Sequence, residues 1–268
     1  MDLSLLKKRL DTLQSKSAPS QKTDYSTIFW RPPVGKAQVR IVPSAYDSKS
    51  PFTELKFYYG ITNKVMVSPL NFGDKDPIAE FAAKLRQGEY DRENFSLAKK
   101  LDPKTRIFIP VIVRGEEDKG VRLWGFGITI YKALLALAED EDVGDFTDVI
   151  NGWDMIVEQQ QGNPYPTTSV RIKPKQSPLS DNNDLVDTWL KEQPNPVEVH
   201  SQYDYDFIKK QLQNYLNPGS AEENAPAAGS ESSTPESSGS PQKTDFTLET
   251  ATAGNKDTVS KFDDLFNE

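Results

Sequence analysis

The fold of this 268-residue chain is decided by the stretch RIFIPVIVRG at residues 106–115, which is rich in β-branched and aromatic residues and predicts a strand. Six more stretches of this kind predict strands at 37–43, 54–61, 63–69, 120–128, 153–161 and 169–174. Helical patterns occupy 77–87, 129–138 and 204–216. Several short strands with one helix after the fifth strand predict a mainly β fold with added helices, whose strands close fully or partly into a barrel.

Composition excludes several classes of site. The chain has no cysteine, so it forms neither disulfides nor thiolate zinc sites, and we expect a reducing, cytoplasmic setting. His200 is the only histidine, which excludes metal sites built on imidazole and acid/base catalysis by histidine. We expect His200 at the surface. No apolar run has the roughly 18 residues of a membrane helix, and the charged N-terminus does not resemble a signal peptide.

The net charge of −8 is unevenly spread along the chain. Residues 217–268 hold ten acids and three lysines, and residues 139–158 hold eight acids and no base, whereas residues 1–216 are nearly neutral overall. The body of the chain is therefore free to carry a basic face despite the acidic total.

Composition also divides the chain into segments. Residues 1–23 predict a basic amphipathic arm with leucines at helical spacing around Lys7, Lys8 and Arg9, and 24–216 form the folded core. Residues 217–255 are rich in Pro, Gly, Ser, Ala and Glu and predict a disordered linker. Residues 256–268 place apolar side chains at helical spacing among acids, which predicts a partner-binding peptide centred on Phe262, Asp263, Asp264, Leu265 and Phe266.

Basic and aromatic residues interleave along the core, as a single-stranded nucleic acid would require. Cations attract phosphates, and exposed rings stack on unpaired bases. In the stretch PYPTTSVRIKPKQSP (164–178), strand alternation puts three cations on one face beside Tyr165. The candidate cations are Lys99, Lys100, Lys104, Arg106, Arg114, Arg122, Arg171, Lys173 and Lys175. The candidate aromatics are Tyr58, Tyr59, Tyr90, Phe95, Trp124, Phe126 and Tyr165.

Some of these aromatics have an alternative role in the core. Trp124 and Phe126 suit an inward-facing position as well as a stacking one, and Tyr58 and Tyr59 are adjacent on a strand, so at most one of them lines a groove. Tyr165 lies between two prolines, which favours exposure.

Enzymatic chemistry has little support in the sequence. The chain has no phosphate-binding glycine loop and no nucleophile elbow. The acidic run at 138–145 lacks the ligand spacing of a calcium loop, so we interpret it as a solvated loop. We therefore expect a protein that is not an enzyme and has no catalytic residues.

The layout resembles the single-stranded DNA-binding (helix-destabilising) proteins of T-even-type bacteriophages. The resemblance lies in GKAQVRIVPS (35–44), PFTELKFYYGI (51–61), FGDKDP (72–77), FSLAKK (95–100), KTRIFIPVIVRG (104–115) and GFGITIYKAL (125–134), in this order, with both terminal segments. It implies an OB-fold (Greek-key β-barrel) core with a DNA groove, an N-terminal arm that joins neighbouring copies on DNA, and an acidic tail that recruits replication and recombination proteins such as polymerase, helicase loader and recombinase. It adds Arg40 as a groove residue, with Lys99, Lys100, Trp124 and Tyr165 also at matching positions.

The chain departs from the family at its zinc subdomain. That region corresponds to residues 62–94 here, which contain no cysteine or histidine, and Tyr59 stands near the place of the zinc-binding histidine. We expect no cofactor and no zinc, and a small metal-free core packed by Phe72, Ile78, Phe81 and Leu85 instead.

Together, these features predict a cooperative, sequence-tolerant coat for single-stranded DNA in the cytoplasm of an infected bacterial cell, active in replication, recombination and repair and not bound to a membrane. Two alternatives remain open: an adaptor whose barrel binds protein and whose tail is a tether, and a single-stranded RNA binder.

Overall fold

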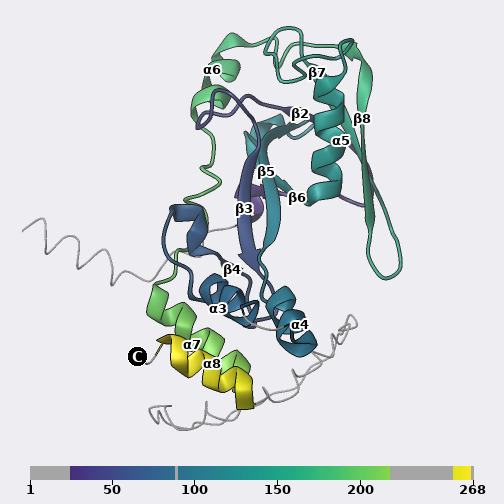
Figure 1. Ribbon diagram of the computed structural model, residues 1–268. Helices are drawn as coiled ribbons and strands as arrows, with labels where there is room; N and C mark the ends of the chain where they lie inside the picture. The colour runs from purple at the N-terminus through teal and green to yellow at the C-terminus, as the bar shows by residue number, and fades with distance from the viewer. Residues whose placement is uncertain (1–24, 88–89, 218–255, 267–268) are drawn as a thin grey trace, which may run out of the picture. The chain divides into compact units, whose positions relative to one another are not determined.

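The computed structural model describes residues 25–87, 90–217 and 256–266 and has a mixed α/β architecture (Figure 1). Two compact units divide the chain. Unit 1 comprises residues up to Phe52, Ile109–Gly125 and Thr129–Pro194; unit 2 comprises Thr53–Phe108, Phe126–Ile128 and the residues from Asn195 onward. The segments predicted as an N-terminal arm (1–23), with Lys7, Lys8 and Arg9, and as a linker (218–255) lie outside the described residues.

Unit 1 is built around antiparallel strands. Its elements are α2 (Tyr25–Ile28), β1 (Phe29–Trp30), β2 (Gly35–Ile41), the 3₁₀ turn η2 (Glu117–Lys119), most of β6 (Arg122–Phe126) and α5 (Ile128–Glu139), β7 (Trp153–Gln160), β8 (Thr167–Gln176) and α6 (Asn183–Lys191). Strand β2 pairs with β7 along most of its length, and β7 and β8 form a long hairpin (Figure 1). Helix α6 packs against the strands of this unit through a core of six buried residues, which includes Ile112 on β5 (Lys104–Val113) and Trp189 on α6.

Strand β5 contributes to both units, because it pairs with β3 through residues 104–108 and with β2 through residues 111–113. Backbone pairing connects eight strands in the order β1-β6-β5-β2-β7-β8, with β3 and β4 branching from β5. Among the described residues β1 and β8 end this order without pairing to each other, so the strands do not close into the barrel that the sequence predicted.

The predicted elements themselves are largely confirmed. All seven predicted strands are present, although β4 is reduced to Met66–Val67, and the three predicted helices correspond to α3 (Pro77–Leu85), α5 and α7 (Tyr205–Leu216). Strand β1 and the helices α4 (Arg92–Lys100) and α6 were not predicted. With these helices the fold is mixed α/β rather than mainly β.

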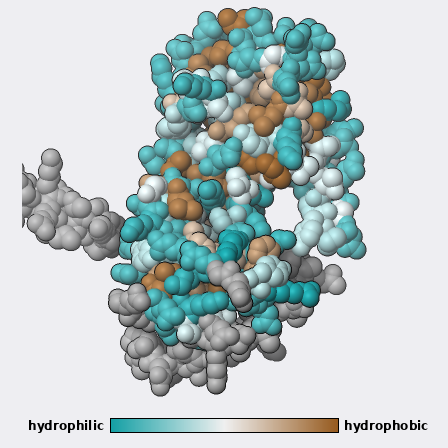
Figure 2. Space-filling view, viewed as in Figure 1, coloured by the Kyte–Doolittle hydropathy of each residue, from teal (hydrophilic) through white to brown (hydrophobic). Residues whose placement is uncertain are grey.

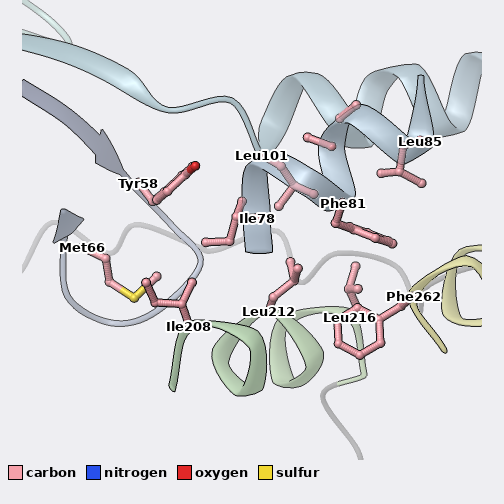
Figure 3. Packing of buried hydrophobic residues seen from close by; sticks show 12 residues of the cluster. Tyr58, Met66, Ile78, Phe81, Leu85, Leu101, Ile208, Leu212, Leu216 and Phe262 are labelled. Carbon is pink, nitrogen blue, oxygen red and sulfur yellow. The ribbon is translucent and has the colours of Figure 1, made fainter. Parts of the chain in front are cut away.

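Unit 2 gathers α3, α4, α7 and α8 (Lys256–Phe266) beside β3 (Thr53–Tyr58), β4 and the 3₁₀ turn η1 (Pro69–Phe72). Helix α3 begins where it does because Asp76 caps two backbone N–H groups, those of Ile78 and Ala79, and Pro77 occupies the first turn. Ile78, Phe81 and Leu85 point into the core of this unit as expected (Figure 3), whereas Phe72 is half-buried and lies outside that core.

A buried hydrogen-bond network joins this core to the cap of α3. The Tyr58 hydroxyl donates to Asp76 Oδ2 at 2.8 Å, and the Ser68 hydroxyl donates to the same oxygen. Burial, reinforced by the neighbouring Asp76 charge, raises the pKa of Tyr58 above its ordinary value. His200 is half-buried against the rings of Phe57 and Phe108 rather than at the surface, and burial lowers its pKa.

The C-terminal peptide is an element of this unit. Helix α8 buries Phe262 in the same core as Phe81, with Leu265 and Phe266 partly buried against it, while Asp263 and Asp264 are exposed. The apolar stripe that predicted a partner-binding peptide therefore packs on the chain's own helices; a role in binding partners stays a prediction.

Candidate nucleic-acid interface

The polar centre of unit 1 is an ion cluster around Asp154, on strand β7. Arg114 binds this carboxylate through Nη2 at 2.9 Å, and Arg40 Nη1 lies 3.5 Å from it. Gln38 donates to its other oxygen at 2.6 Å. Pairing of β2 with β7 places Arg40 directly opposite Asp154, so strand register assembles the cluster. Two guanidinium groups share one carboxylate, which leaves positive charge in excess.

Arg40 is a structural member of this cluster and not an exposed groove residue. Its side chain is 0% exposed, and its Nη2 donates to the carbonyl oxygen of Asp148 at 2.7 Å. A side chain at Gly152 would collide with Arg40 Nη2, so glycine makes room for the guanidinium. Burial lowers the pKa of Arg40, and the Asp154 charge opposes that shift. The expectation of Arg40 as an exposed groove residue is therefore wrong for this structure, because its side chain is fully buried between Asp154 and the Asp148 carbonyl.

Next to the cluster, unit 1 has a cleft of about 940 Å³. Its lining includes five cations and a single acid, Glu116. The cations are Arg31, Lys36, Arg114, Lys119 and Arg122, and the rings of Phe29 and Trp30 form part of the wall. Gly35, at a φ of 105°, allows the turn from the Pro-Pro segment into β2 that brings Arg31 and Lys36 to the same cleft.

The cations of the cleft differ in how strongly they are engaged. Arg122 is buried and donates to Glu116, which also binds Lys119 at 3.2 Å, and these contacts lower the pKa of Glu116. The Nε of Arg122 is buried without a hydrogen-bond partner. The Lys36 side chain is 61% exposed, and its Nζ lies 3.8 Å from Glu158 Oε2. Solvent screens an exposed ion pair of this length, so the pair is weak. Lys36 can therefore engage a polyanion at little cost, and Arg31 is exposed at the same cleft.

Strand β8 extends the basic surface of unit 1. The Lys173 ammonium donates to Gln38 Oε1 at 3.2 Å, which ties it to the Asp154 cluster, while Arg171 and Lys175 are exposed. Tyr165 lies in the turn of the β7–β8 hairpin and is 66% exposed, as expected from its flanking prolines. The projecting end of this hairpin shows hydrophilic and neutral colours without brown in Figure 2.

Three predicted stacking residues belong to the core. Trp124 is 1% exposed and packs edge-on against Trp30 with ring centroids 5.4 Å apart. Phe126 and Tyr58 are also buried. Trp124 and Phe126 therefore take the inward-facing alternative, because β6 is buried on nearly its whole length. Tyr58, on β3, is the buried member of its adjacent pair with Tyr59.

The remaining candidates lie in unit 2, and the cleft lies in unit 1. Tyr59, Tyr90 and Phe95 are exposed, and Tyr90 and Phe95 contact each other with centroids 5.9 Å apart. Lys99 and Lys100 are exposed at the end of α4; Lys104 is exposed and Arg106 half-buried on β5. Their role in binding DNA stays a prediction.

The sequence prediction missed Arg31, Lys36 and Lys119. Arg31 and Lys36 flank the proline-glycine turn RPPVGK (31–36), and this local signal points to both of them. Within residues 25–87, 90–217 and 256–266, no group of three or more His, Cys, Asp or Glu side chains is arranged to hold a metal ion. Over the same residues, no helix is both long and apolar enough to cross a bilayer.

Comparison with known proteins leaves the chain without an assigned family: no model of a protein family matches it, and no curated protein has a similar sequence.

Proposed function

We propose that the chain is a non-enzymatic single-stranded DNA-binding protein whose strand runs through the cationic cleft of unit 1. The observation that carries the proposal is the lining of that cleft, in which Arg31, Lys36, Arg114, Lys119 and Arg122 face one glutamate. A chain of net charge −8 that gathers five cations in one cleft has a specific place for a polyanion.

The mechanism follows from the chemistry of the cleft. Each phosphate that a cation neutralises releases condensed counterions, which drives binding without reading sequence. Phe29 at the wall, and Tyr165 on the hairpin of the same unit, supply rings for unpaired bases, whose faces are unavailable in a duplex. A ligand of single strands lowers their free energy and so melts hairpins by mass action.

The finer features stay part of this proposal. The resemblance to T-even-type phage proteins supports a relationship of the unit 1 strands to the OB fold, in an open form, and a place in replication, recombination and repair in the cytoplasm of an infected cell. It also supports cooperative contact between neighbouring copies through residues 1–23, recruitment of replication proteins through the tail, and a protein without zinc or any other cofactor.

The test is binding of a fluorescein-labelled oligothymidine, followed by anisotropy, to the full chain and to two charge-matched double variants. Lys36→Glu/Lys119→Glu reverses two cations of the cleft, whereas Lys132→Glu/Lys191→Glu reverses two exposed lysines of the same unit that lie on helices away from it. We expect the cleft variant to lose at least about tenfold in affinity at low salt and the control about twofold or less.

Equal losses in both variants would show that only net charge matters and would remove the cleft from the mechanism. An unmodified chain that binds no oligonucleotide at low salt would leave the protein-binding adaptor as the better hypothesis. Equal affinity for oligouridine would extend the substrate class to RNA.

A further inference from the structure

Helix α8 packs against α3 and α7 of unit 2 (Figures 1 and 3), and the surface of these two helices that α8 covers is called the α3–α7 groove below. Its central side chain, Phe262, is 2% exposed and meets the ring of Phe81 edge-on, with centroids 5.7 Å apart. Phe266 packs on Phe262 at 4.7 Å and on Tyr205 at 6.4 Å. The Phe262 side chain is therefore the main apolar contact between α8 and the groove.

A cation at the rim of the groove fixes the end of the helix. Lys209, on α7, donates through Nζ to the carbonyl oxygen of Phe266 at 2.8 Å, and the same ammonium lies 5.1 Å from the Phe266 ring centroid. A lysine at a helix C-terminus also meets the negative end of the helix dipole. Asp263 and Asp264 remain exposed on the opposite face. The groove thus has a defined ligand: a short helix with two buried or half-buried aromatic side chains, exposed acids, and a backbone carbonyl in its last turn that accepts from Lys209.

The helix is an addition to the core of unit 2 rather than its framework. Of the twelve buried residues in this core, only Phe262 comes from α8; the others lie on β3, β4, α3, α7 and the α4 segment through Leu101. An isolated helix of eleven residues is marginal in water, so α8 owes its helicity to the groove. Residues 218–255 separate it from α7, so the groove recognises a peptide that is remote along the chain.

We propose that the α3–α7 groove is a peptide-binding site that accepts α8 from a second copy of this chain as well as its own. The groove makes the same contacts with α8 whether the helix comes from its own chain or from a second copy. Binding within the chain is favoured only because the linker keeps α8 close to the groove. The linker gives α8 an effective concentration at its own groove of order millimolar. Exchange between copies is therefore favoured where the local concentration of the chain reaches that value. The partner of this surface is therefore the chain itself, and the proposal does not depend on DNA binding.

The experiment uses a labelled synthetic peptide of residues 256–268 and full-length receptors. Phe262→Ala disables the chain's own helix and leaves the groove vacant, so this variant should bind the peptide in a saturable manner. The unmodified chain should bind it at least about tenfold more weakly, because its own α8 competes. Adding Lys209→Glu to the Phe262→Ala receptor should weaken the peptide by about tenfold, and adding Lys210→Glu, an exposed neighbour on the same helix, should change it about twofold or less.

Exchange between copies is tested by complementation. Phe262→Ala carries an intact groove and Lys209→Glu an intact helix, so a mixture of the two should form a one-to-one complex in sedimentation analysis under conditions in which each alone is monomeric. A Phe262→Ala chain that retains its circular dichroism but binds no peptide, or a mixture that stays monomeric at millimolar concentration, would overturn the proposal.

A second design covers the case in which Phe262→Ala fails to fold. A protease site placed near residue 235 of the full chain allows α8 to be severed after folding. The severed fragment should dissociate on dilution and be replaced by labelled peptide, with circular dichroism of the remainder largely retained. A fragment that never exchanges, or a remainder that unfolds when the fragment leaves, would show that α8 is a fixed part of the core.

Discussion

Asp154→Asn is the substitution that tests the ion cluster of unit 1 most severely. Asparagine keeps the size of the side chain and much of its hydrogen bonding to Gln38 and Arg114, but removes the charge. Arg40, which is 0% exposed, then keeps its charge with only the Asp148 carbonyl at 2.7 Å and the Ser177 hydroxyl at 3.4 Å as polar partners. The perturbation therefore leaves a buried cation without its ion-pair partner, with the Asp148 charge nearby as partial compensation.

Removing one partner of a buried ion pair costs about 3–5 kcal/mol. We place Asp154→Asn near the lower end of that range, about 3 kcal/mol, because Arg114 is 20% exposed and can be partly solvated. With a urea m-value of about 2 kcal/mol/M, the unfolding midpoint should fall by about 1.5 M. Glu158→Gln breaks the exposed pair with Lys36 in the same unit and should cost less than about 1 kcal/mol.

Intrinsic fluorescence is the assay that isolates this effect, because all four tryptophans of the chain, Trp30, Trp124, Trp153 and Trp189, lie in unit 1. Urea unfolding followed at these residues reports the stability of the unit that holds Asp154. If Asp154→Asn shifts the midpoint no more than Glu158→Gln does, with an unchanged slope, the cluster contributes little and the argument from buried charge fails.

Three further predictions concern unit 2 and the basic strand. Asp76→Ala removes the cap of α3 and the acceptor of the Tyr58 and Ser68 hydroxyls. It should lower the free energy of unfolding, measured by helical circular dichroism in urea, by about 3 kcal/mol. A loss below about 1 kcal/mol would mean that water replaces the carboxylate. Burial lowers the pKa of His200, so the unfolded chain binds a proton at a higher pH than the folded chain does. The stability from this group should be full above about pH 6.5 and fall as the pH drops below it. His200→Gln should reduce the slope of stability against pH, and an identical slope in the variant would assign it to other groups. Arg171→Ala should reduce the salt dependence of DNA binding by about 0.7 in the slope of log affinity against log salt, and an unchanged slope would place β8 outside the interface.

The sequence predicted the strands well because burial on both faces imposes a dense β-branched and aromatic composition, as in the seven buried positions that end β5. It did not predict α4, because RENFSLAKK is mostly polar and buries only Asn94 and Ala98. Barrel closure could not be predicted either. It depends on whether the terminal strands of the sheet pair, and nothing local to β1 or β8 specifies that pairing.

The candidate site was predicted only in part, for a different physical reason. Arg40 was assigned to the groove through the resemblance alone. Its ion-pair partner Asp154 is more than a hundred positions away and lies opposite it only through the register of β2 with β7. Trp124 was a candidate through the interleaving of aromatics with cations and through the resemblance, and neither shows which face of a strand is exposed to solvent. Tyr165 was placed correctly because its two prolines act locally, within the turn that exposes it.

Competition between single-stranded and duplex DNA across a range of salt concentrations tests the central claim most directly. The readout is anisotropy of labelled DNA, since Trp124 and Trp189 are buried and report the strand poorly. The account predicts that oligothymidine binds at least about tenfold more tightly than a duplex of equal length, because stacking on each unpaired base is worth about 1–3 kcal/mol. Its log affinity should also fall against log salt with a slope of about −2 to −3.5, set by the cations of the cleft. Equal affinity for the two forms of DNA, or no binding at low salt, would contradict it.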